Sequence, residues 1–143
     1  LNQHELRPVA ASSLLTDGEH LCYRPEWVLR TFQTAKEIPV RDYLHVVMHC
    51  IFRHMYMSPS IDREYWDLAC DIAAEYVITG LGIKAAEAPR QEEQKQYFKA
   101  IQHDLNHVTA EKLYAYLRQT APNPMRLAQL QDIFPRMITH SGI

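Results

Sequence analysis

The sequence lacks the features that mark several classes of protein. It has only three cysteines, Cys22, Cys50 and Cys70, and no two of them form a C-x-x-C pair. An odd number without paired spacing argues against a disulfide framework and favours a reducing, cytoplasmic setting. No apolar stretch is long enough to span a membrane and no signal peptide opens the chain, so we expect no membrane partner.

An excess of charge of one sign is also lacking. The 143 residues carry 15 basic and 17 acidic side chains, and no run rich in lysine or arginine occurs. The electrostatic footprint of a nucleic-acid-binding protein is therefore missing. Apolar residues make up 47% of the chain, which is enough for the core of one domain over residues 1–143. The chain begins with Leu1 rather than Met, which suggests a piece of a longer protein.

Turn signals and helical spacing predict a mainly α domain, formally α+β, with one small N-terminal β-hairpin. The hairpin is expected over residues 11–23, because Asp17-Gly18 between short apolar runs is a strong two-residue turn signal. Residues 84–96 are polar and are expected to form a solvated loop with a helical approach at its end. Helices are expected over residues 26–34, 40–56, 62–79, 97–105, 110–119 and 125–137.

The helix expected over residues 40–56 carries the most informative pattern. Apolar residues lie on nearly all of its sides, which predicts that it is buried. His45 and His49 are four residues apart, so they lie about 40° apart and one turn along the helix. Two imidazoles at this spacing can bind one metal ion, as in many catalytic zinc sites. Burying both rings is costly unless each finds a partner.

The next helix offers a third ligand. Glu64, Asp67, Asp71 and Glu75 form an acidic stripe at spacings of three and four residues. For Glu64 and Asp67 we expect a solvated face. Asp71 lies in an apolar stretch and needs a partner, so it is the first choice for the third ligand. Glu75 is a second candidate ligand, or a catalytic base.

Three further residues bear on the chemistry. A catalytic zinc site needs a base to activate water, and in H-E-x-x-H enzymes this base is the Glu after the first His. That position is Val46 here. Asp42 lies on the face of the two His and is either a partner that orients one of their rings without binding the metal or a solvated acid in the first turn. His54 is about 180° from His45 on an unbroken helix, so we expect it to be a core residue or to contact a metal ligand without binding the metal itself.

Three segments, in this order, resemble a known family. They are LTDG (15–18) running into YRPE (23–26), YLHVVMHCIFRH (43–54) and WDLACD (66–71). The chain resembles the metallopeptidase domain that precedes a von Willebrand factor A-like domain in bacterial proteins. That family typically shows H-E-x-x-H, a further His five residues on, and W-x-x-A-x-D on the next helix. The resemblance is strong over residues 11–80 and looser over residues 109–117.

The resemblance implies a zincin-like helical core with a metal, Zn²⁺ by analogy, between two central helices. His45 and His49 match the metal-binding histidines, Asp71 matches the third ligand, and His54 matches the further His. The sequence departs from the family at Val46, and it carries Glu75 where Asn is common. The resemblance also implies a von Willebrand-like domain beyond residue 143 and an association with an AAA+ ATPase of the MoxR type.

The favoured hypothesis is a pseudoenzyme that keeps the fold and the metal and binds a protein or peptide, because Val46 replaces the general base. The alternative is an active zinc-dependent hydrolase in which Glu75 is the base. A third hypothesis is that no metal binds and the two histidines are hydrogen-bonded core residues. A metal-dependent phosphohydrolase built on His103-Asp104 is less favoured, because that dipeptide lies in a polar stretch.

Overall fold

The computed structural model describes residues 5–8, 14–16, 20–23, 40–52 and 59–137, with side chains in the last two ranges. Three predicted features lie outside the described residues. These are the helix expected over residues 26–34, the turn at Asp17-Gly18 and the side chain of His54. None of the described helices is both long and apolar enough to cross a membrane.

The longest of the described elements is helix α3, Arg63–Leu81. The Asp62 side chain caps its first turn by accepting a hydrogen bond from the backbone N–H of Tyr65. Gly82 ends the helix in the left-handed conformation, with φ of 65°, and its N–H donates to the carbonyl of Thr79. The predicted helix over residues 62–79 is confirmed to within two residues at its end.

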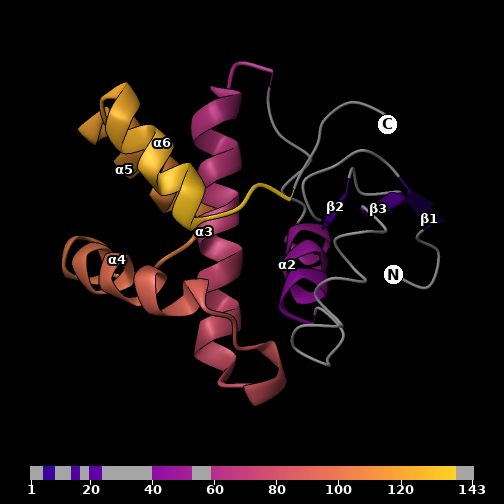
Figure 1. Cartoon of the computed structure of the whole chain (residues 1–143). Helices are drawn as coiled ribbons and strands as arrows, with labels where there is room; N and C mark the ends of the chain where they lie inside the picture. The colour runs from indigo at the N-terminus through magenta and orange to yellow at the C-terminus, as the bar shows by residue number, and fades with distance from the viewer. Residues whose placement is uncertain (1–4, 9–13, 17–19, 24–39, 53–58, 138–143) are drawn as a thin grey trace.

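Helix α3 stands between two groups of elements (Figure 1). On one side lie α4 (Arg90–Asp104), α5 (Ala110–Thr120) and α6 (Pro124–Ile133). On the other side lies α2 (Val40–Ile51), which also contacts the short 3₁₀ helix η1 (Lys84–Ala86). The described residues are mainly helical, as the sequence predicts.

The apolar core lies on the side of α3 that faces α5. Leu113 and Leu117 of α5 are fully buried there. The remaining buried members of this cluster come from α3, α4, the start of α5 and the region of α6: Trp66, Leu68, Ala69, Cys70, Ile72, Ala73, Phe98, Ile101, Ala110, Leu130 and Phe134. The apolar face of α3 thus packs against α5, and the face of α3 that carries Asp71 and Glu75 packs against α2.

Three short strands lie beyond α2 (Figure 1). They are β1 (Glu5–Pro8), β2 (Leu14–Thr16) and β3 (His20–Tyr23), in the order β1-β3-β2. The β1 and β3 strands are parallel, whereas β2 and β3 are antiparallel. The β2 strand contacts α2. The hairpin with its turn at Asp17-Gly18 stays a prediction, because residues 17–19 are not described.

The loop expected over residues 84–96, with a helical approach only at its end, is wrong for most of this stretch. This stretch forms η1 and the first two turns of α4, which begins at Arg90 immediately after Pro89. The prediction failed because the first turns of α4 have almost no apolar periodicity. Residues 90–97 bury only Gln94, while good helix formers supply the backbone preference.

Two helix ends and one buried face also differ from expectation. Helix α2 ends at Ile51 and α6 ends at Ile133, both earlier than predicted. The outer side of α2 is not buried, since Tyr43 and Ile51 are exposed. The buried side of α2 carries polar side chains in addition to Val46 and Val47, and these polar side chains form the candidate site.

Candidate metal centre

Helix α2 supplies two fully buried imidazoles, His45 and His49. The four-residue spacing places the rings one turn apart on the side that faces α3, and their centroids lie 4.6 Å apart. Neither ring has any solvent exposure. Each ring must therefore find its polar partners inside the protein.

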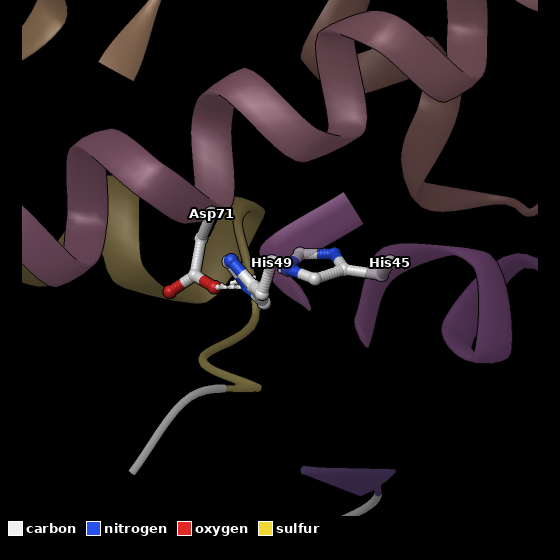
Figure 2. A group of neighbouring side chains, drawn as sticks. All are labelled: His45, His49 and Asp71. Carbon is white, nitrogen blue, oxygen red and sulfur yellow. Dashed lines mark hydrogen bonds and ion pairs between the residues drawn. The ribbon is translucent and has the colours of Figure 1, made fainter. Parts of the chain in front are cut away.

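Both rings find the same partner on α3, Asp71. Its Oδ1 atom lies 2.9 Å from Nε2 of His45 and 2.9 Å from Nε2 of His49. Figure 2 shows the three side chains turned toward one another. The backbone N–H of Met137, in the segment after α6, donates to the same oxygen at 3.4 Å. Two nitrogens from one helix and one oxygen from the next thus converge on one point. The predicted association of these three residues is what the structure shows.

The donor set fits a divalent metal. One ligand atom from each of the three residues can be chosen so that all lie within 4.8 Å of one another, in a fully buried cluster. Zn²⁺ binds imidazole and carboxylate at about 2.0–2.2 Å, so neighbouring ligands of a tetrahedral site lie about 3.3 Å apart. The 2.9 Å separations between Asp71 and each ring need to open by only a few tenths of an ångström.

Glu75, one turn after Asp71, contacts the other nitrogen of His45. Its Oε2 atom lies 2.9 Å from Nδ1 of His45. Glu75 is fully buried. Glu75 and Asp71 therefore contact different nitrogens of the His45 ring. A metal held at Nε2 would be separated from Glu75 by the imidazole itself.

The second oxygen of Glu75 is surrounded by donors that the sequence did not reveal. Oε1 lies 3.2 Å from Nε of Arg41, 2.6 Å from Nε of Arg90 and 2.9 Å from Nε2 of Gln94. Arg41 comes from α2, whereas Arg90 and Gln94 come from α4. The α4 contacts were missed because residues 84–96 were interpreted as a loop. A buried carboxylate in the sequence signals that cations must exist, but it does not say where they lie.

Asp42 has a different partner from the one expected. Its Oδ1 atom accepts a hydrogen bond from Nη2 of Arg90 at 2.5 Å, and its side chain is buried. Asp42 thus contacts the arginine that contacts Glu75. The alternative of a solvated acid in the first turn is wrong, because Arg90 reaches back from α4 and covers it.

The other two residues of the acidic stripe, Glu64 and Asp67, lie in different surroundings. Glu64 is exposed, as expected. Asp67 is buried, and its Oδ2 atom lies 3.1 Å from Nη2 of Arg136, so the expected solvated face is wrong at this position. The cause is again a distant cation, since Arg136 lies in the segment after α6.

The pKa values of the site follow from this geometry. Burial alone would lower the pKa of His45, but its hydrogen bonds to Asp71 and Glu75 together raise it to about 9. Burial would raise the pKa of Asp71, yet the hydrogen bonds from both histidines hold it below its usual value. Glu75 is likewise held well below its usual pKa, despite burial, by His45 and Arg90. Burial lowers the pKa of His49.

When no metal is bound, these pKa directions give His45 one proton more than a neutral imidazole carries. Ionised carboxylates only accept hydrogen bonds, so the protons of all three histidine contacts lie on the rings. His45 then bears protons on both nitrogens and is a buried cation between Asp71 and Glu75. A metal ion at Nε2 would take the place of one of these protons.

A pocket with mixed polar and apolar lining opens beside Asp71. It has a volume of about 520 Å³ and runs along α3 toward the end of α6. Its wall includes Asp71 and the ion pair of Asp67 with Arg136. The further lining residues are Arg63, Glu64, Leu68, Gln131 and Phe134. Of the three candidate ligands, only Asp71 reaches this wall.

Comparison with known proteins places the chain in one family. Residues 3–131 match the model of the family described as "Putative metallopeptidase domain", and the chain belongs to that family. No characterised protein and no solved structure matches it. The resemblance stated from the three sequence segments is confirmed at the level of the family. The family description agrees with a site built from His45, His49 and Asp71.

Proposed function

We propose that this domain holds a divalent metal, Zn²⁺ by its donor set, and binds a protein or peptide segment beside it. The observation that carries the proposal is the convergence of two Nε2 atoms on one Asp71 oxygen in a buried site. Two imidazoles and one carboxylate form a ligand set typical of zinc in zincin-like cores, with a fourth position left for another ligand.

We propose further that the domain binds rather than hydrolyses. Val46 follows the first histidine, is buried, and can neither accept nor donate a proton. Glu75 is the carboxylate expected to substitute, but both of its oxygens are engaged, Oε2 by His45 and Arg90 and Oε1 by three donors. Its contact with Nδ1 of His45 supports a role in positioning that ligand.

The competing proposal is an active hydrolase that uses another carboxylate as its base. One observation favours it: Asp67 lines the same pocket as Asp71, one helical turn away. Asp67 is paired with Arg136, so a substrate would have to separate this pair to use it. We therefore favour binding, with this pocket as the place for the bound segment.

The metal proposal is tested by elemental analysis of protein purified under zinc-replete conditions. We expect one metal ion per chain in the wild type and none in His49→Ala. His103→Ala is the matched control, because His103 is exposed and far along α4, and we expect it to keep the metal. Absence of metal from the wild type, or its retention in His49→Ala, would contradict the proposal.

The binding proposal is tested with fluorescein-labelled unfolded casein as the probe. We expect the wild type to bind it without cleavage, and Gln131→Trp to weaken binding by filling the pocket. Asp132→Trp is the control, because this neighbour is also exposed but does not line the pocket. Cleavage of the probe that a chelator stops and added Zn²⁺ restores would establish the hydrolase instead.

A further inference from the structure

We propose that Glu75 is a positioning residue that fixes which nitrogen of His45 is free to bind a metal. The inference rests on the proposed metal site and adds a requirement to it. The side chain at position 75 must be a carboxylate, and an amide of the same shape cannot replace it. The reason lies in the direction of every hydrogen bond around Glu75.

Oε1 of Glu75 faces three groups that can only donate. Nε of Arg41 and Nε of Arg90 carry fixed N–H groups, at 3.2 and 2.6 Å. The third donor is the Gln94 amide nitrogen, at 2.9 Å. The position of Oε1 therefore requires an acceptor.

Gln94 cannot turn over to become an acceptor there. Its Nε2 also donates to the carbonyl of Ile133 at 2.9 Å, and its Oε1 accepts from Nη2 of Arg41 at 3.3 Å. Flipping the amide would set like groups against each other at all three contacts. Gln94 is fully buried, so no water is at hand to replace these hydrogen bonds.

Oε2 of Glu75 faces Nδ1 of His45 at 2.9 Å, and Nη2 of Arg90 donates to the same oxygen over a longer 3.5 Å. A carboxylate accepts at both ends, so it holds the proton on Nδ1 and leaves Nε2 free to coordinate. In Glu75→Gln, the three donors select the carbonyl end of the new amide. Its NH₂ group then faces His45 and requires Nδ1 to accept. A neutral His45 would carry its proton on Nε2, where the metal should bind.

The substitution is thus expected to weaken metal binding strongly although it changes the shape of the side chain very little. Removal of an ordinary partner of a metal-binding histidine weakens binding by about 10- to 100-fold. Glu75→Gln reverses the tautomer as well as removing a charge, so we expect a loss at or above the upper end, on the order of 100-fold.

Asp42→Asn provides the matched control. Asp42 belongs to the same buried network and loses the same charge, but it contacts Arg90 and is not hydrogen-bonded to His45. The new amide can still accept from Arg90 through its carbonyl oxygen. We expect its metal affinity to fall by less than about tenfold. A comparison of the two variants separates the tautomer from the loss of negative charge.

The experiment measures the Zn²⁺ affinity of the full chain by competition with a chromophoric chelator, with circular dichroism to verify folding. A loss of about 100-fold in Glu75→Gln with a small change in Asp42→Asn supports the inference. Equal losses in the two variants, or wild-type affinity in Glu75→Gln, would overturn it.

Nitrogen-15 NMR of the histidine rings gives a second readout that needs no bound metal. We expect a hydrogen-bonded proton on Nδ1 of His45 in the wild type, assigned by its loss in His45→Asn, and no such proton in Glu75→Gln. Absence of the Nδ1 proton from the wild type would overturn the inference even if the variant failed to fold. A wild type that shows this proton yet binds no Zn²⁺ would support the positioning role and refute the metal site alone.

Discussion

Raising the pH should destabilise the metal-free domain through one residue, His45. The folded protein holds the pKa of His45 at about 9, compared with 6.5 for an ordinary histidine. Between these two values the folded state binds a proton that the unfolded state releases. The stabilisation from His45 is therefore fully present below about pH 6.5 and is lost as the pH rises through about 9.

The magnitude follows from the same two values. Each pH unit between them corresponds to about 1.4 kcal/mol, so His45 contributes about 3 kcal/mol that disappears by about pH 10. The total stability of a domain is about 5–15 kcal/mol, so the effect is a large fraction of it. The physical source is the ion pair of the His45 imidazolium with Asp71 and Glu75.

Urea unfolding in the presence of a chelator, followed by circular dichroism from pH 6 to pH 10, measures this effect. Other groups titrate near pH 10, so the informative quantity is the difference between the wild type and His45→Gln. We expect the wild type to lose about 3 kcal/mol more than the variant over this range. Parallel profiles for the two proteins would refute the reasoning, because His45 would then not hold a proton between the carboxylates.

Three further predictions concern other parts of the molecule. Asp71→Ala should weaken Zn²⁺ binding by at least about 100-fold in a chelator competition, since it removes the ligand that both histidines face; retained affinity would exclude Asp71 as a ligand. Gly82→Ala should destabilise the domain by about 1 kcal/mol in urea unfolding, because the φ of Gly82 is 65°. Gly80→Ala should stabilise it by up to about 1 kcal/mol, because Gly80 lies inside α3 and a Cβ there would also meet open space. Leu113→Ala should cost about 2–5 kcal/mol in the same measurement, because Leu113 is fully buried between α3 and α5; a cost near zero would mean that this interface is not the core.

The sequence was sufficient to predict the three candidate ligands because each has a local signal. His45 and His49 are related by one helical turn, and helical spacing depends only on the backbone. Asp71 is a carboxylate inside an apolar stretch of a helix with clear cap residues, Asp62 and Gly82. Burial of the acid could therefore be expected before its partners were known.

The partners of Glu75 could not be predicted in the same way. Arg90 and Gln94 lie 15 and 19 residues after Glu75, beyond the turn that follows α3. Nothing in a single sequence states which face of α4 returns to α3. The polar composition that concealed α4 has a direct cause. Its first turns carry side chains that donate hydrogen bonds to the buried carboxylates. These turns therefore lack the apolar periodicity by which a helix is usually detected.

The α2–α3 interface is difficult to explain by stability alone. It buries three carboxylates, Asp42, Asp71 and Glu75, against Arg41 and the partly buried Arg90. These charges balance only when a further cation lies between Asp71 and Glu75, and His45 with two protons is that cation. Burying such a network generally stabilises a protein less than an apolar interface of the same size. On the opposite side, α3 packs against α5 through an apolar core, so the same helix also forms an interface of the more stabilising, apolar kind. The charged interface therefore favours a functional role over a purely structural one, and two buried imidazoles that converge on Asp71 are a ligand set that suits a metal ion.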